Sequence, residues 1–87
     1  MNVVCIPAYN EEAKIKEVVK KALPYVDKVI VCDDGSTDNT AALAKKAGAI
    51  VISHETNLGY GAAISTLFDY CRKNNAEMAA PYPRFVS

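Results

Sequence analysis

Two runs of apolar, mostly β-branched residues constrain the fold of this 87-residue chain more than any other feature. They occupy residues 3–6 and 29–32, and each precedes a stretch with the apolar spacing of an amphipathic helix. A third unit repeats the order, with a strand expected at 49–53 and a helix opening near Gly61. Strands that alternate with helices in this way form a parallel sheet with right-handed crossovers. We therefore predict a three-layer α/β fold with a parallel sheet of strand order 3-2-1.

The element boundaries follow from the same patterns. We expect strands at 2–6 and 28–32, a first helix over about 11–23 that Pro24 ends, and a second helix from 37 or 38 to 48. The lysines of the first helix are interpreted as a solvated face. Phe68 and Met78 are interpreted as core residues.

Residues 1–87 are expected to form a single domain with an irregular tail at 77–87, because prolines such as Pro81 cannot join a central strand ladder. That arrangement would leave the first strand as an exposed edge, although it is apolar along its whole length. Exposed edges invite pairing. We therefore expect either that the tail adds a short fourth strand or that two chains form a homodimer across this edge.

Composition excludes several classes of function. Ten basic and ten acidic residues cancel, which argues against a nucleic-acid surface. No apolar run approaches the roughly 20 residues of a membrane span, and the N-terminus lacks the layout of a signal peptide. The three cysteines are odd in number and show no CxxC spacing, which disfavours a disulfide framework or a zinc site and favours a cytoplasmic location. Cys5 and Cys32 are interpreted as small buried hydrophobes.

The candidate chemistry follows the ends of the first two strands. Residues 7–12 read Pro-Ala-Tyr-Asn-Glu-Glu, and residues 33–36 read Asp-Asp-Gly-Ser. The carboxyl ends of parallel strands meet at the edge where open α/β sheets bind ligands. There, the Asp34 carboxylate can accept a hydrogen bond from the imino N–H of uracil or guanine, and the Tyr9 ring can stack on the base. The bland alternative is that both acids and Gly35 form only a turn into the next helix.

A third stretch, Asn57-Leu58-Gly59-Tyr60-Gly61, places two glycines before a helix. Backbone N–H groups at a helix N-terminus attract anions, which would suit a diphosphate. Alternatively, the small residues only allow the helix to pack closely on the sheet.

Together these stretches resemble the nucleotide-binding half of the inverting glycosyltransferases of family 2, a group with the GT-A fold that includes dolichyl-phosphate mannose synthases and polyprenyl-phosphate glycosyltransferases. The resemblance covers about residues 2–76 and implies a Rossmann-like, truncated GT-A domain. It implies transfer of a sugar, with inversion, from a UDP- or GDP-sugar to an acceptor such as a polyprenyl phosphate. A full-length relative would act in the cytoplasm or at the membrane surface.

The resemblance also implies residue roles. Asp34 would read the base, while Asp33 would support the turn. Contacts to the nucleoside would come from Pro7, Tyr9 and Glu11, with Cys32 touching the base weakly through its backbone, and the diphosphate would be bordered by Asn57, Gly59 and Gly61. No catalytic residue and no metal ligand is assigned.

Family enzymes hold Mg²⁺ or Mn²⁺ at an Asp-x-Asp motif after a fourth strand, and this sequence lacks that motif and the acceptor elements. We expect no metal to be held by this chain and no activity from it alone. The alternative function is a non-catalytic module that binds nucleotide weakly or serves as an interaction domain.

Two other folds fit less well. A receiver-type signalling domain has an aspartate after its third strand, where this chain has Ser53 and His54. A dinucleotide-binding unit needs G-x-G-x-x-G after its first strand, where this chain has Pro7 and Tyr9. His54 itself is expected to make an ordinary hydrogen bond and is not assigned to a site.

Overall fold

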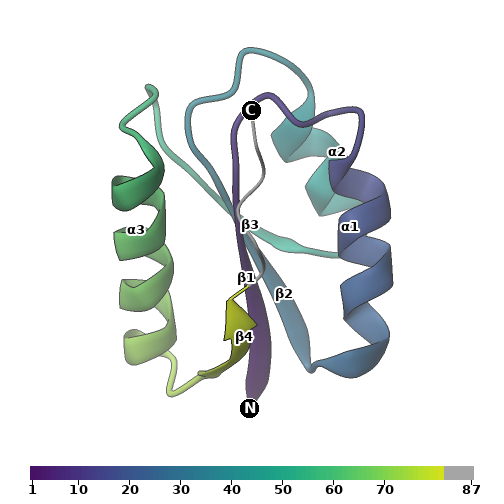
Figure 1. Cartoon of the computed structure of the whole chain (residues 1–87), viewed down its shortest axis with the longest axis vertical. Coiled ribbons are helices and arrows are strands. Elements are labelled where there is room, and N and C mark those ends of the chain that lie inside the picture. Colours follow the sequence, from purple (N-terminus) through teal and green to yellow (C-terminus); the bar gives the residue numbers. More distant parts are fainter. Residues whose placement is uncertain (82–87) are drawn as a thin grey trace.

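The computed structural model describes the backbone of residues 1–81 and the side chains of residues 1–77. Four parallel strands form one sheet in the order β3-β2-β1-β4, with α1 and α2 on one face and α3 on the other (Figure 1). The predicted three-layer α/β fold and the 3-2-1 order are therefore confirmed. The elements in chain order are β1 (Asn2–Ala8), α1 (Ile15–Ala22), a short 3-10 helix (Leu23–Tyr25), β2 (Lys28–Asp33), α2 (Thr40–Lys46), β3 (Ile50–Ser53), α3 (Tyr60–Lys73) and β4 (Glu77–Pro81).

Two apolar cores, one on each face, hold β1 and β2 in the middle of the sheet. Alternate residues of a strand point to opposite faces, so Val4 and Ile6 join the core under α1 and α2, whereas Val3 and Cys5 join the core under α3. Leu67 of α3 is fully buried on that second face. Burial on both faces explains why these strands read as continuous apolar runs rather than alternating ones.

Residues 77–81 correct the prediction of an irregular tail. They form β4, which pairs in parallel with β1 from Asn2 opposite Glu77 to Cys5 opposite Pro81. Pro81 is tolerated because β4 is the outer strand of the described sheet, where a missing N–H interrupts no central ladder. The short fourth strand thus exists and pairs with residues 2–5 of β1, so the first of the two expected arrangements is the one that the structure has. The remaining part of the predicted tail, residues 82–87, lies outside the described residues.

Two further expectations on the helices need correction. The first helix begins at Ile15 rather than at residue 11. Phe68 is 56% exposed and is not a core residue, because the buried stripe of α3 runs through Ala63, Leu67 and Cys71. The side chain of Met78 lies outside the described part of the chain.

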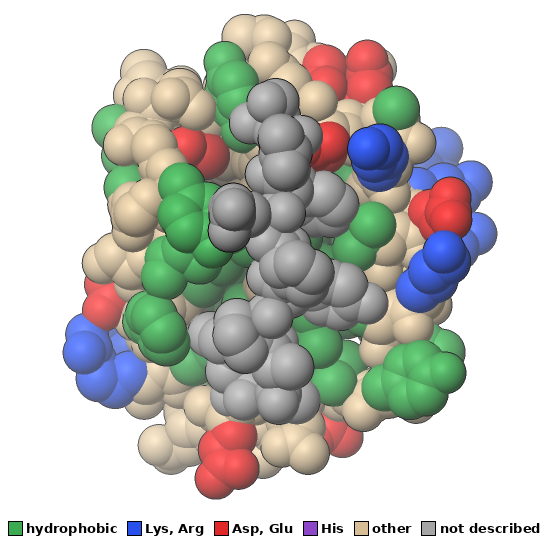
Figure 2. All heavy atoms as spheres, viewed as in Figure 1, with side chains coloured by type: hydrophobic (Ala, Val, Ile, Leu, Met, Phe, Trp, Pro, Cys, Tyr) green, Lys and Arg blue, Asp and Glu red, His purple; other side chains and the backbone are tan. Residues whose placement is uncertain are grey.

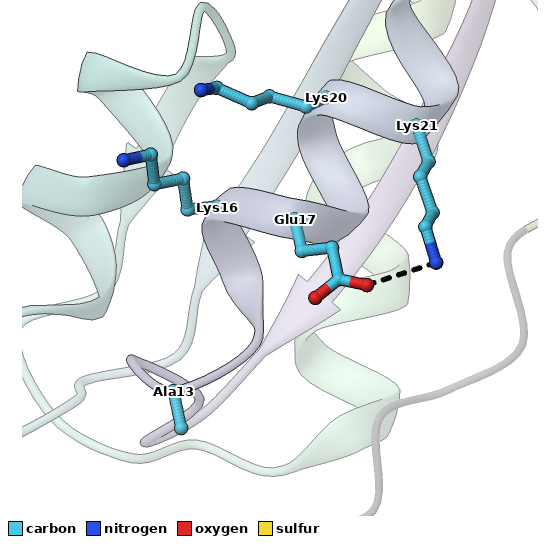
Figure 3. A pocket seen from close by; sticks show the side chains of 5 residues that line it. All are labelled: Ala13, Lys16, Glu17, Lys20 and Lys21. Atoms are coloured by element: carbon cyan, nitrogen blue, oxygen red, sulfur yellow. Dashed lines mark ion pairs between the residues drawn. The ribbon is translucent and has the colours of Figure 1, made fainter.

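The outer surface of α1 is basic, as expected. Lys and Arg side chains gather on the α1 side of the molecule (Figure 2). They border a shallow hollow of about 430 Å³ that contains no candidate site residue and is lined by Ala13, Lys16, Glu17, Lys20 and Lys21 (Figure 3). Lys21 pairs with Glu17 at 2.9 Å there. In the part of the chain that the structure describes, no helix has the length and apolar character needed to cross a bilayer.

The cysteines are buried free thiols, as predicted for Cys5 and Cys32. The Sγ atoms of Cys5 and Cys71 lie 3.5 Å apart. Burial, with the neighbouring Cys71, raises the pKa of Cys5 to about 12. The Cys5 thiol therefore stays protonated at neutral pH and acts as a core side chain.

Candidate functional site

The segments that follow β1, β2 and β3 meet at the carboxyl edge of the sheet. Ala8 lies opposite Asp33, and Asp33 lies opposite Ser53. Beyond the strands, the Asp34 N–H donates to the Ala8 carbonyl at 2.8 Å and the His54 N–H donates to the Asp33 carbonyl at 2.9 Å. The two acidic residues therefore lie beside the segment that begins with Tyr9, as the sequence predicted from the strand ends.

Hydrogen bonds between side chains and backbone tie the first of these segments to the second. Asn10 Oδ1 accepts from the Thr37 N–H at 2.9 Å, and the Asn10 N–H donates to Ser36 Oγ at 2.8 Å. The Glu11 N–H donates to Thr40 Oγ1 at 2.8 Å. These long-range bonds satisfy N–H groups before α1 from outside the helix. They give Asn10 a role in holding the loop.

The Asp34 carboxylate is the centre of the site, and four protein donors surround it. Oδ1 accepts from His54 Nδ1 at 2.8 Å and from the Leu58 N–H at 2.9 Å. Oδ2 accepts from the Gly59 N–H at 2.9 Å and from Asn57 Nδ2 at 3.1 Å. Burial alone would raise the pKa of Asp34, but the hydrogen bonds from His54, Leu58 and Gly59 hold this pKa below its ordinary value. The group is therefore a carboxylate at neutral pH.

His54 is the site residue that the sequence did not reveal. Its ordinary hydrogen bond was expected, but the partner is Asp34. Since a carboxylate only accepts, Nδ1 carries the proton, and in the neutral ring Nε2 accepts from the Thr66 hydroxyl at 2.8 Å. His54 thereby connects the end of β2 to α3. The register of β3, which sets Ser53 opposite Asp33, is the signal that would have placed residue 54 beside residue 34.

Two carboxylate oxygens at this edge are buried without a hydrogen-bond partner in the described part of the chain. They are Glu11 Oε2 and Asp33 Oδ1, on residues that are 6% and 5% exposed. Buried polar atoms in native proteins are nearly always paired, so each unpaired one calls for an explanation. Both oxygens can accept hydrogen bonds from hydroxyl or N–H groups of a ligand.

The remaining predicted residues differ in how far they are buried and in whether they contact the Asp34 network. Tyr9 is half-buried directly after β1, and Pro7 is buried opposite Cys32 in the β1–β2 ladder. The Cys32 side chain belongs to the core under α3, and burial, with nearby Asp34 and Asp33, raises its pKa to about 11. Gly61 lies in the first turn of α3 and takes no part in the Asp34 network.

No cluster of three or more His, Cys, Asp or Glu side chains is placed to hold a metal ion among the described residues. The Asp34 carboxylate at this edge accepts hydrogen bonds from backbone and side-chain donors, and Glu11 and Asp33 each have one unpaired carboxylate oxygen.

The fold and its acidic carboxyl edge define a GT-A-type α/β domain. The sequence model of the family described as "Glycosyl transferase family 2" matches residues 3–74. The chain belongs to glycosyl transferase family 2.

Two relatives with named activities agree with this assignment, and a third similar protein is uncharacterized. Glucosyl-3-phosphoglycerate synthase of Mycobacterium tuberculosis is 36% identical and aligns with 95% of this chain and 31% of its own length. The UDP-N-acetylglucosamine–dolichyl-phosphate N-acetylglucosaminyltransferase of Methanococcus voltae is 34% identical over 88% of this chain and 38% of its own. An uncharacterized protein of Methanocaldococcus jannaschii is 46% identical over 72% of this chain and 26% of its own. The chain thus spans about a quarter to two fifths of the length of these relatives.

Solved structures match the same part. A crystal structure of the M. tuberculosis synthase superposes with a TM-score of 0.71 at 37% identity, covering 80% of this chain and 30% of that one. The complex of that enzyme with Mn²⁺, UDP-glucose and phosphoglyceric acid gives a TM-score of 0.64 at 40% identity, covering 74% and 27%. Both structures are of one enzyme, which was crystallised in the second case with a nucleotide sugar and a divalent metal.

Proposed function

We propose that this chain binds the nucleoside diphosphate of a nucleotide sugar at the carboxyl edge of its sheet. The observation that carries the proposal is the pair of buried, unpaired oxygens, Glu11 Oε2 and Asp33 Oδ1, beside the half-buried Tyr9. A nucleoside offers ribose hydroxyls and a base N–H that can donate to these oxygens, and a flat base that can stack on the Tyr9 ring. Family membership supports the same ligand class.

Each candidate residue has a role in this proposal. Tyr9 stacks on the base, Glu11 accepts from a ribose hydroxyl, and Asp34 accepts from the base N–H. The backbone of Pro7 and Cys32 lies next to the base, and Asp33 supports the turn and offers its unpaired oxygen to the nucleoside.

The diphosphate lies against the segment before α3 and the first turn of that helix, at Asn57, Gly59 and Gly61. UDP in the names of the M. voltae enzyme and of the M. tuberculosis complexes favours uracil over guanine.

The activity proposed for the complete reaction is transfer of the sugar, with inversion, to an acceptor such as a polyprenyl phosphate or another hydroxyl or phosphate group. Relatives whose names give different acceptors support this breadth: the undecaprenyl-phosphate 4-deoxy-4-formamido-L-arabinose transferase of Pseudomonas fluorescens and the glucosyl-3-phosphoglycerate synthase of M. tuberculosis. We propose that this chain contributes donor binding rather than transfer by itself. Incubation with UDP-glucose and Mn²⁺ tests this. Release of free glucose above that of a sample without protein would show that the chain by itself cleaves the donor.

The ring contact predicts a binding defect without a folding defect. Tyr9→Ala should weaken UDP binding by about 1–3 kcal/mol, the range for stacking of a base on an aromatic side chain. Isothermal titration calorimetry measures it, with matched circular dichroism spectra as the folding check. Tyr25→Ala is the control, because Tyr25 is 84% exposed and lies before β2, at the opposite edge of the sheet. Equal affinities for the wild type and Tyr9→Ala would show that the base lies elsewhere.

A further inference from the structure

The Asp34 carboxylate already fills the place that an anion would take in the glycine segment 57–59. Both of its oxygens are engaged, by the N–H groups of Leu58 and Gly59, the Asn57 amide and the His54 ring. A carboxylate offers about four acceptor positions, so no position remains for a further donor. Asp34 cannot accept a base N–H in this arrangement unless one protein donor leaves.

The donors that surround Asp34 are the ones suited to a phosphate. Leu58 and Gly59 directly precede α3, a 14-residue helix whose N-terminus favours negative charge. Gly59 has φ of +105° and open space where a Cβ would stand, so a ligand can approach its backbone. Asn57 and Leu58 are exposed. Asp34 itself is buried, whereas two residues of the segment that donates to it are exposed to solvent.

We propose that Asp34 is an exchangeable internal ligand of segment 57–59, which rests on the proposed nucleotide binding at this edge. A nucleoside diphosphate replaces the hydrogen bonds between Asp34 and segment 57–59, and it supplies a new partner to each of the two. Its base N–H takes the place of a segment donor at Asp34, and the freed N–H groups donate to phosphate oxygens. Asp34 and the freed N–H groups of the segment are all paired again only when one ligand carries both the base and the phosphate groups.

This exchange makes the site selective for the intact nucleoside diphosphate. A nucleoside alone would leave the Leu58 and Gly59 N–H groups without an anion. Pyrophosphate alone would leave Asp34 without the donors of segment 57–59, which is costly for a buried charge. His54 stays on Asp34 throughout, because the Thr66 hydroxyl holds its ring from the far side. His54 is therefore a positioning residue for Asp34.

The reciprocal behaviour of Asp34→Asn tests the exchange. Removing the internal anion should weaken UDP binding by about tenfold or more, the factor for a lost hydrogen bond to a charged group. The same change should strengthen binding of inorganic pyrophosphate several-fold, because the segment donors no longer have a carboxylate partner. Glu55→Gln is the control, since it also removes one negative charge next to the segment. Pyrophosphate affinity that rises no more in Asp34→Asn than in Glu55→Gln would overturn the proposal.

The wild-type chain provides a second test that does not depend on the variant folding. In ¹⁵N-resolved NMR titrations, UDP should shift the Leu58 and Gly59 amide resonances strongly, and uridine or pyrophosphate at the same concentration should shift them little. Shifts from UDP at Tyr9 and Glu11 with unmoved Leu58 and Gly59 amides would refute the exchange and leave nucleotide binding intact. A folded chain that responds to neither UDP nor GDP would refute the proposed function and the exchange with it.

Discussion

Replacing Gly35 by alanine should destabilise the fold by about 2–4 kcal/mol and disrupt the carboxyl edge. Gly35 has φ of +73°, where an L residue with a Cβ is strained by roughly 1–2 kcal/mol. An added Cβ would also lie 2.3 Å from the Thr56 carbonyl carbon and 2.5 Å from the Asn57 nitrogen. Because these are backbone atoms, segment 56–57 would have to move, and overpacking of this kind costs about 1–3 kcal/mol. Urea denaturation measures the loss.

Gly61→Ala is the matched control and should have the opposite sign. Gly61 lies in the first turn of α3, and nothing lies within 4 Å of its added Cβ. Alanine there should stabilise the chain by up to about 1 kcal/mol, because it lowers the entropy of the unfolded state and suits the helix. If the two variants have equal stability, the close approach of segment 56–57 to Gly35 is not a feature of the folded chain.

Removing the Asp34 side chain should have the second largest effect, a loss of about 2–3 kcal/mol of stability at pH 7. Asp34→Ala leaves the His54, Leu58 and Gly59 donors without their acceptor, and hydrogen bonds to a charged group contribute about 1.5–3 kcal/mol. Partial exposure of segment 57–59 lets water replace some of these bonds, which keeps the total well below their sum. Asp69→Ala, at a surface pair with Arg72, should change stability by less than about 1 kcal/mol.

The same contact should make stability depend on pH in a defined direction. The pKa of Asp34 is lowered in the folded chain, so the contribution of its ionised form is fully present above the pKa of an unfolded aspartate, about 3.9. It is lost as the pH falls through the lower folded value. The stability difference between the wild type and Asp34→Ala should therefore shrink below about pH 4. A difference that stays unchanged down to pH 3 would contradict the ionised contact.

Features that depend on local sequence pattern were predicted correctly, whereas features that depend on contacts between residues far apart in the sequence were not. The apolar runs gave the strand order, and the motifs after them gave the acidic edge. The expected start of α1 was wrong because residues 10–12 form a loop that is bonded to residues 36–40, and apolar spacing does not reveal these distant partners. Phe68 was misplaced because its helical spacing matches the buried stripe of α3, but the sheet contacts only the positions around Leu67.

The tail and the His54 contact show two other limits. The two prolines argued against a strand after residue 76, but an outer strand tolerates what a central one does not, and only the topology shows that β4 is outermost. His54 and Asp34 meet because β2 and β3 are in register. The pairing joins residues 20 positions apart, and no spacing rule within one segment reveals it.

An amide-resolved NMR titration of the chain with UDP and with GDP, each with and without Mg²⁺, tests the central claim most directly. We expect shifts confined to the carboxyl edge, at Tyr9, Asp34 and Gly59, with UDP giving the larger response. Tyr25 and Gly48, which precede β2 and β3 at the opposite edge, should not move. A well-dispersed spectrum that ignores both nucleotides, or that responds mainly at the opposite edge, would contradict nucleotide binding at this site.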